Sequence, residues 1–352
     1  MHSYSRRELL MGMGAAMAFG ALPSRAAASS GSAREVVAGS PAHIVNYLPH
    51  LVAMTEKLMA PEGLSLKLIS SNGGSKLREI VAAGQVMFGL GDSSHAIQLI
   101  NRARPAKILL AIDERCPYTN VVIRKDLHAK GLTTLERLAE WKRPDGSKPV
   151  MAVSTIGGGQ HVYASYVTEQ MGLDARFHWV GGGVTQTMVG GLKTGKFDAI
   201  VAAPSWQLES VAKGFGAVIF DATDVRAWNK VFKGPVPVTC IYALQSTVEK
   251  EPELVQKYVN GIYRSLQWIK TASPEAIWNS TGEKYLADQG KELALKELAF
   301  YKPMLNYSGL VSASSFRNGS PIWFRESTGM KPVTFEEAVD LRFISNSKDK
   351  YG

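Results

Sequence analysis

The chain has 352 residues, a formal net charge of +9 at neutral pH and two cysteines. Two cysteines exclude a disulfide-rich scaffold, and at most one bridge can form between them. The lysines and arginines are scattered, with no basic run and no aromatic RNA-binding motif, so we expect no nucleic-acid partner.

Residues 1–28 have the features of an export signal. Arg6 and Arg7 precede a mildly apolar run of about 14 residues, shorter than the roughly 20 that span a bilayer, and an Ala-x-Ala site follows at Ala26–Ala28. The paired arginines resemble the twin-arginine export signature. We therefore expect a soluble periplasmic chain that begins near Ser29. The alternative is an amphipathic N-terminal helix. Cleavage would remove three arginines and one glutamate and leave a net charge of +7.

Short apolar runs alternate with helical patterns through the first 112 residues. Strands are predicted at residues 35–39, 65–69, 87–90 and 107–112. Gly84 ends one of the helical patterns between them, and Asp92 or Ser93 can cap the next helix. Strands that alternate with helices predict a parallel sheet.

The same plan returns after residue 150. The stretch Gly84–His95 and the stretch Gly195–Trp206 share one order: a helix-ending glycine, a short strand, then small residues that turn into a helix. Their offset of 111 residues is too long for a solenoid repeat and indicates two similar lobes. Further strands are predicted at residues 120–124, 150–153, 177–180, 199–201 and 239–244.

Periodicity weakens at residues 221–234, where we expect the chain to cross back between the lobes. Beyond it, a helix is predicted over residues 253–270, Ser273 is a predicted N-cap, and Thr334–Glu337 is a predicted capping box. These tail helices are expected to pack on the first lobe. The predicted organisation is a signal at 1–28, a first lobe at 29–113 plus 234–352, and a second lobe at 114–233 with crossover segments at both its ends.

Loops at the carboxyl ends of parallel strands form the ligand crevice of such sheets. Several of these loops are rich in glycine and serine and lead into helices, whose free N–H groups suit an anion. The triplets Gly157–Gly159 and Gly181–Gly183 are equally consistent with ligand contact and with tight turns. Tyr47, Tyr118, Tyr163 and Trp206 can form a stacking wall or belong to the core.

The sequence contains none of the common catalytic motifs: no Gly-x-Ser-x-Gly elbow, no phosphate-binding loop, no His-Glu-x-x-His and no paired cysteine ligands. We therefore expect neither an enzyme nor a cofactor. His43, His95 and His161 lie at loops or helix starts, but no carboxylate cluster accompanies them, so polar ligand contacts or surface positions are favoured over a metal site. Asp92 can hold a ligand amine or simply cap a helix.

Several short motifs resemble, in their order, the NMT1/THI5-like family of periplasmic binding proteins for nitrate, sulfonates, taurine and thiamine-precursor pyrimidines. The motifs are Tyr47–Ala53, Glu62–Leu64, Asn72–Ser75, Ala82–Gly89 and Gly195–Ala199. The resemblance covers roughly residues 35–300. It implies an α/β, two-lobed type II periplasmic binding protein fold, in which each lobe is a mostly parallel sheet flanked by helices and the ligand cleft lies between the lobes.

The resemblance also implies six ligand loops: residues 40–43, 72–75, 91–95, 155–160, 182–184 and 203–206. The candidate ligand-binding residues are Ser40, His43, Tyr47, Asn72, Gly73, Gly74, Ser75, Asp92, Ser93, Ser94, His95, Tyr118, Thr155, Gly158, Gly159, Gln160, Gly183, Val184, Pro204 and Trp206. His95 and Trp206 depart from the family at the two matching turns, so the ligand of a relative cannot be assumed here.

The expected function is capture of a small organic anion, a sulfonate, carboxylate or similar group on an aromatic or apolar body, for an ABC importer permease in the inner membrane. We expect a monomer. The alternatives are a thiamine-precursor pyrimidine or an amine as ligand, and a TRAP carrier or sensor as partner. An NMT1-like biosynthetic enzyme is disfavoured, since those enzymes carry a dense cysteine motif that is absent here.

Cys116 and Cys240 flank predicted strands near the junction of the lobes. The periplasm permits a bridge between them, but sequence spacing cannot establish the short Cα separation that a bridge needs. Two buried reduced thiols are therefore favoured.

Overall fold

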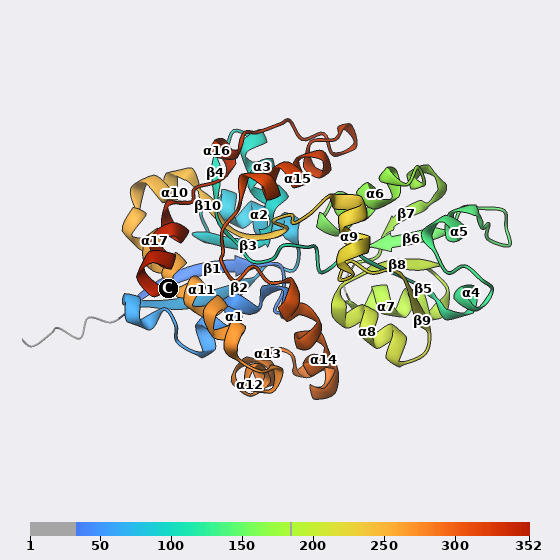
Figure 1. Ribbon diagram of the computed structural model, residues 1–352, viewed down its shortest axis with the longest axis horizontal. Coiled ribbons are helices and arrows are strands. Elements are labelled where there is room, and N and C mark those ends of the chain that lie inside the picture. Colours follow the sequence, from blue (N-terminus) through green and yellow to red (C-terminus); the bar gives the residue numbers. More distant parts are fainter. Residues whose placement is uncertain (1–32, 184) are drawn as a thin grey trace, which may run out of the picture. The chain divides into compact units, whose positions relative to one another are not determined.

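The computed structural model describes residues 33–183 and 185–352. The predicted export signal and Val184 lie outside these residues. Two five-stranded sheets organise the described chain, and each is flanked by helices (Figure 1). We call the part built on the first sheet the first lobe, and the sheet of strands β5 to β9 with helices α4 to α9 the second lobe.

The first sheet has the strand order β2-β1-β3-β10-β4. Its strands are β1 (Arg34–Ser40), β2 (Leu64–Ser70), β3 (Phe88–Asp92), β4 (Ala106–Ala111) and β10 (Thr239–Leu244). β1 pairs in parallel with β2 and with β3, whereas β10 runs antiparallel to both β3 and β4.

The second sheet repeats this order as β7-β6-β8-β5-β9. Its strands are β5 (Asn120–Arg124), β6 (Val150–Val153), β7 (His178–Gly181), β8 (Ala199–Ala202) and β9 (Gly216–Phe220). β5 is antiparallel to β8 and β9, while β6 is parallel to β7 and β8. The two stretches that share one order in the sequence therefore contain β3 and β8, the middle strands of the two sheets. The prediction of two similar α/β lobes with mostly parallel sheets is confirmed.

The helices lie on the faces and ends of these sheets. Their bounds are α1 (Leu48–Thr55), α2 (Gly74–Ala82), α3 (Ser93–Asn101), α4 (Lys125–Ala129), α5 (Leu135–Glu140), α6 (Gly159–Gln170), α7 (Thr185–Thr194), α8 (Pro204–Ala212), α9 (Val225–Phe232), α10 (Gln245–Lys250), α11 (Pro252–Thr271), α12 (Pro274–Ile277), α13 (Glu283–Tyr285), α14 (Lys291–Tyr301), α15 (Ala313–Trp323), α16 (Phe335–Ala338) and α17 (Arg342–Tyr351). In this part of the chain no helix is both long and apolar enough to cross a membrane.

Residues 221–234, where the sequence predicts that the chain crosses back between the lobes, contain helix α9, which the sequence did not predict. Asp224 caps the helix by accepting hydrogen bonds from the N–H groups of Arg226 and Ala227. Trp228, Val231 and Phe232 are buried at helical spacing, and the Trp228 and Phe232 rings stack with centroids 3.9 Å apart. One short apolar stripe is too small to stand out in a sequence window, which is why this helix escaped prediction.

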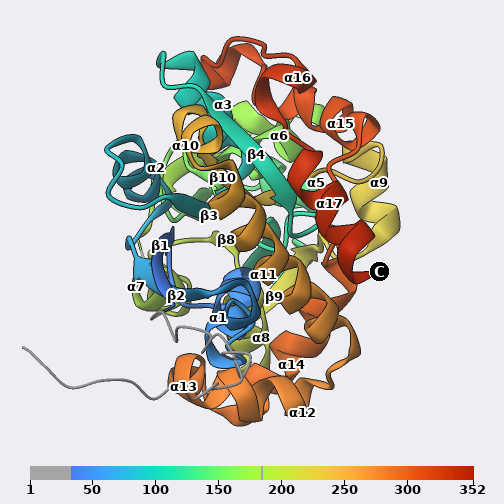
Figure 2. The ribbon, with the colours of Figure 1, turned by 90° about the vertical axis from the view of Figure 1, so that its left-hand side faces the viewer.

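The C-terminal helices contact both lobes. Helix α11 packs against α1 and α17 of the first lobe (Figure 2), Ser273 caps α12, and Thr334 with Glu337 forms the predicted capping box. However, α14 packs on α8 and α15 packs on α6, both in the second lobe. The tail therefore adds interlobe contacts that the sequence did not predict. The predicted lobe limits at residues 113/114 and 233/234 stay a prediction.

Candidate ligand-binding cleft

A cavity of about 410 Å³ lies between loops of the two lobes. The first lobe contributes residues that follow β1, β2 and β3, and the second lobe contributes residues that follow β6, β7 and β8. These are the carboxyl ends of the parallel strands, where the open sheets of α/β proteins place their ligands.

Fifteen of the twenty candidate residues line this cavity. They are Tyr47, Asn72, Gly73, Gly74, Ser75, Asp92, Ser94, His95, Tyr118, Thr155, Gly158, Gly159, Gln160, Gly183 and Trp206. The lining also includes four further residues of the predicted ligand loops, Pro41, Ala42, Gly157 and Ala203, and five residues that the sequence did not single out, namely Ile44, Asn46, Arg78, Gln98 and Ser154.

The other candidates lie outside the lining. Ser40 is fully buried and donates a hydrogen bond to the Ala42 carbonyl, while His43 packs edge-on against Tyr285. Ser93 points away from the cavity and donates to the carbonyls of Pro237 and Val238. Pro204 is buried in the first turn of α8, and Val184 is outside the described residues. Binding by any candidate stays a prediction.

Two helix starts at the cavity have no side-chain cap. Gly73 precedes α2 and Gly158 precedes α6, and neither helix has an N-cap side chain that accepts a hydrogen bond. By contrast, Asp92 caps α3 by accepting from the Ser94 N–H, and Glu297 of α14 accepts from the Ser205 N–H at the start of α8. The orphan N–H groups of α2 in the first lobe and α6 in the second therefore remain available to a ligand.

Asp92 lies in the cavity wall and accepts hydrogen bonds from two other lining residues. Its Oδ2 accepts a hydrogen bond of 2.7 Å from the Tyr118 hydroxyl, and its Oδ1 accepts one of 2.8 Å from the Ser94 N–H. Burial raises the pKa of this carboxyl, and the hydrogen bonds from Ser94 and Tyr118 oppose that shift. A Cβ atom at Gly159 would lie 2.7 Å from Oδ2, so only glycine lets the α6 start come this close.

Arg78 is the main residue that sequence reasoning missed. It lies on α2, lines the cavity and is half-buried, and its Nε is buried without a hydrogen-bond partner. Within residues 33–183 and 185–352, no acidic group lies within ion-pair distance of its guanidinium. Burial and the nearby positive charge of Arg102 lower its pKa. The charges of Glu79 and Asp92 oppose this shift without forming an ion pair, and an anion in the cavity would add a direct counter-charge.

Aromatic side chains form part of the wall. Tyr47, Tyr118 and Trp206 are each about nine-tenths buried and line the cavity, whereas Tyr163 is a core residue whose hydroxyl accepts a hydrogen bond from Trp323. Burial lowers the pKa of His95 to about 3, so its imidazole is neutral at physiological pH. The cavity lining thus combines open N–H donors, the Arg78 cation and the hydrogen-bonded Asp92 carboxyl group with an uncharged aromatic wall.

The described residues hold no group of three or more His, Cys, Asp or Glu side chains that could bind a metal ion. Cys116 and Cys240 are both free and buried, as favoured from the sequence, and neither lines the cavity. Burial raises the pKa of both thiols, which keeps them protonated and unreactive.

Comparison with known proteins places the chain in a family. The model of the NMT1-like family matches residues 42–280. A protein from Bordetella bronchiseptica RB50 is 21% identical, with a TM-score of 0.76 over 90% of this chain and 98% of the other. The putative sulfonate ABC transporter component SsuA, a periplasmic sulfonate-binding protein from Methylobacillus flagellatus KT, is 14% identical, with a TM-score of 0.65 over 91% and 95%.

The desulfurization enzyme DszB shares the fold as well, with 14% identity and a TM-score of 0.61 over 91% of this chain and 100% of that enzyme. No curated protein sequence matches the chain. Similarity to solved structures at these sequence identities shows only the fold. The family model matches more than half of the chain and therefore shows the family. The chain therefore belongs to the NMT1-like family and has the periplasmic binding protein fold.

Proposed function

We propose that this chain is an exported solute-binding protein that captures a small organic anion between its lobes and passes it to an ABC importer. The observation that carries the proposal is the pair of uncapped helix starts, one from each lobe, that face one cavity beside the unpaired Arg78.

The electrostatics of these groups favour an anion. A helix start carries roughly half a positive charge and several N–H donors that lack intrahelical partners. Because α2 and α6 belong to different lobes, an anion that accepts hydrogen bonds from both makes its full set of contacts only when the lobes are close together. The anion would then bind more tightly when the lobes are close together than when they are apart. A ligand shifts a conformational equilibrium toward the state that it binds more tightly, so binding would favour the closed arrangement.

The aromatic wall suggests what the anion is attached to. Tyr47, Tyr118 and Trp206 offer ring faces and edges to an apolar or aromatic body. We therefore propose a carboxylate, sulfonate or similar group on such a body as the ligand class.

The proposed partner and location rest on the family and on the sequence. SsuA, which shares the fold, is named as a component of a sulfonate ABC transporter. The first 28 residues have the features of an export signal. Together they support delivery of the ligand in the periplasm to the permease of an importer.

An amine bound at Asp92 is the competing ligand class. Each Asp92 oxygen already accepts a hydrogen bond within the protein, and the unpaired Arg78 guanidinium lines the same cavity. Both features disfavour a cationic ligand.

A thermal-shift screen of the mature chain would test the proposal. The panel would contain sulfonates, aromatic carboxylates, nitrate, pyrimidines and amines. A ligand present at 100 times its Kd stabilises a protein by about 2.7 kcal/mol, which is readily detected as a rise in Tm. We expect shifts with organic anions. A shift with amines alone, abolished in Asp92→Asn, would contradict the proposal.

A further inference from the structure

A second cavity adjoins the cleft and shares part of its wall. It has a volume of about 470 Å³ and, like the first cavity, is lined by Gln98 and Gly157. We call the cavity at the helix starts the inner chamber and this second one the outer chamber. The outer chamber lies between the end of α3, helix α6 and residues 325–331.

One face of α3 runs along both chambers. Ser94 lines the inner chamber, Gln98 lines both, and Asn101 with Arg102 lines the outer chamber. This spacing of three and four residues places the side chains on a single helix face. The eight-residue separation of Ser94 and Arg102 corresponds to about 12 Å along the helix axis. The two chambers therefore share a wall at Gln98 and Gly157, and both border α3.

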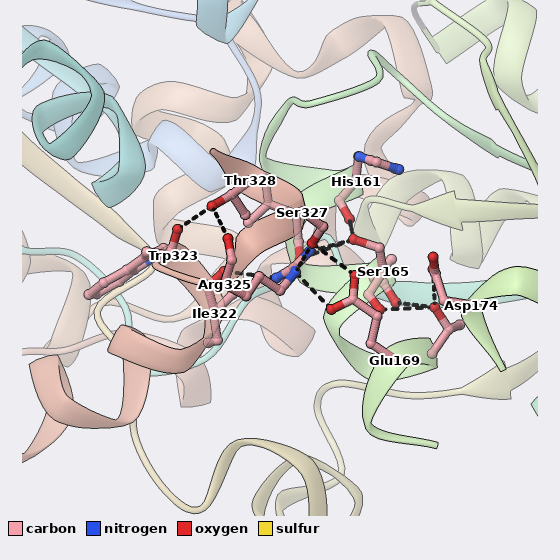
Figure 3. A network of polar contacts seen from close by, with 12 residues as sticks. His161, Ser165, Glu169, Asp174, Ile322, Trp323, Arg325, Ser327 and Thr328 are labelled. Atoms are coloured by element: carbon pink, nitrogen blue, oxygen red, sulfur yellow. Dashed lines mark hydrogen bonds and ion pairs between the residues drawn. The ribbon is translucent and has the colours of Figure 1, made fainter. Parts of the chain in front are cut away.

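The outer chamber contains two cations without a partner. Neither Arg102 nor Lys331 forms an ion pair with any described acidic residue. The acidic side chains of this chamber are already engaged: Glu169 pairs with Arg325 at 2.9 Å (Figure 3), and Asp174 accepts hydrogen bonds from Thr168 and Trp179. Arg102 and Lys331 are therefore available to pair with an anionic group in the outer chamber.

Polar contacts hold the walls of the outer chamber in place. Arg325 donates a hydrogen bond of 2.8 Å to the Val162 carbonyl and one of 2.6 Å to the Ser165 hydroxyl, both on α6 (Figure 3). The Lys331 N–H donates 2.6 Å to Asn101 Oδ1, and the Asn101 amide donates back to the Lys331 carbonyl at 3.2 Å. The backbone of Lys331 is thereby held against Asn101 at the end of α3, and the side chains of Lys331 and Arg102 are both exposed.

The junction of the chambers offers an apolar surface. Ile156 is 50% exposed, which is unusual for a large aliphatic side chain, and it lines the outer chamber beside the shared Gly157. A hydrocarbon segment that passes from one chamber to the other would cover this side chain and remove its surface from water.

We propose that the ligand is an elongated organic diacid. Its first acidic group lies between the α2 and α6 helix starts, its apolar middle passes Ile156, and its second acidic group reaches Arg102 and Lys331. This inference rests on the proposed function and narrows its ligand class to anions with two acidic groups about 12 Å apart or less.

Titration calorimetry with matched acids would test this inference. The probes are the diacids adipate, suberate and sebacate and the monoacids hexanoate, octanoate and decanoate. The proteins are the wild type, the double variant Arg102→Ala/Lys331→Ala, and the control Lys125→Ala/Arg226→Ala, which removes two exposed cations outside both chambers. We expect at least one diacid to bind about fivefold or more tightly than its monoacid, a modest factor because Arg102 and Lys331 are exposed and solvent screens their ion pairs.

The double variant should lose this preference while it keeps its affinity for the monoacid, and the control should behave as the wild type does. Equal affinity for diacids and monoacids in the wild type would overturn the diacid inference and leave anion capture standing. A preference that persists in the double variant would overturn it as well. Failure of every carboxylate and sulfonate to bind would overturn the proposed function itself.

Discussion

The charge of Arg78 is the residue-level feature on which anion capture most depends. Replacing it with glutamine removes the cation and keeps much of the side-chain length. We expect Arg78→Gln to raise the Kd for the anionic ligand about 10- to 100-fold, since a hydrogen bond to a charged group contributes roughly 1.5–3 kcal/mol. Calorimetry would measure this change. Arg226→Gln, at an exposed site outside both chambers, is the matched control, and equal affinities of the two variants would argue against a role for Arg78.

Asp113 should make the stability of the protein depend on pH. It is fully buried, its Oδ1 accepts from the N–H groups of Val238 and Thr239, and burial raises its pKa to about 8. An unfolded chain loses this proton near pH 3.9, so the folded state binds the extra proton between the two pKa values. Stability therefore falls as pH rises through that range, by at most about 1.4 kcal/mol per pH unit from this group.

The Asp113→Asn variant should show a flatter dependence between about pH 6.5 and 8, a range chosen above the ordinary histidine pKa. Urea unfolding at several pH values would measure it. Parallel curves for variant and wild type would contradict the expected titration.

Individual site residues were predictable only where chain position alone places them at the cleft. Asp92 ends β3 and Gly159 begins the helix that follows β6, so the topology brings them to the cavity. Arg78 lies on α2, four residues beyond Gly74. From the sequence alone, an arginine at this position cannot be distinguished from one on a solvent-exposed helix face. Ser40 and Ser93 were predicted to bind ligand because they lie in loops, but their side chains donate hydrogen bonds to backbone carbonyls instead. The packing around a side chain determines its orientation, and this packing cannot be derived from the loop sequence.

At the scale of elements, Arg325 anchors the segment around residues 325–331 to α6. Its side chain is 13% exposed and contacts Glu169, Val162 and Ser165. We expect Arg325→Ala to remove these charge-assisted hydrogen bonds and to destabilise this contact by about 1–3 kcal/mol. Hydrogen exchange followed by mass spectrometry should show faster exchange in residues 325–331 and in α6. Arg317→Ala, an exposed arginine on α15, should not change exchange there. Unchanged exchange in Arg325→Ala would rule out the anchoring role.

The strands and the long helices were predictable because apolar periodicity defines them. The predicted strand at residues 150–153 coincides with β6, and the helix predicted at 253–270 coincides with α11 to within a residue at each end. Strand direction was not predictable, because a buried strand has the same residue pattern whichever way it runs. The antiparallel placement of β5 and β10, and the packing of α14 and α15 on the second lobe, depend on contacts far apart in the chain.

At the scale of the whole molecule, we expect anion binding to draw the lobes together. Small-angle scattering should give a smaller radius of gyration at saturating concentrations of an anion identified by thermal shift. In Gly159→Ala the added Cβ would meet Asp92 Oδ2 at 2.7 Å, so the decrease should be smaller and the affinity lower. Gly190→Ala, where nothing lies within 4 Å of the added atom, should close as the wild type does. Identical scattering with and without ligand would contradict closure.

The export route is a separate prediction. Replacing Arg6 and Arg7 by lysine keeps the charge but alters the paired arginines that resemble the twin-arginine signature. We expect the protein to disappear from the periplasmic fraction when cells are fractionated and blotted. An unchanged periplasmic yield would exclude the twin-arginine route and leave the proposed binding function untouched.

The position of β10 in the first sheet has a consequence for how the chain acquires its structure. The strands of the second sheet all lie in one stretch of sequence, from Asn120 to Phe220. In the first sheet, β10 pairs with both β3 and β4, although it follows β4 by more than a hundred residues. Until β10 arrives, β3 and β4 present unpaired edges that invite association with other chains. Pairing strands that are so far apart in the chain is slow. We therefore expect the sheet of the second lobe to form before the sheet of the first lobe is complete. A nascent or truncated chain that ends before Leu244 should therefore need protection by a chaperone.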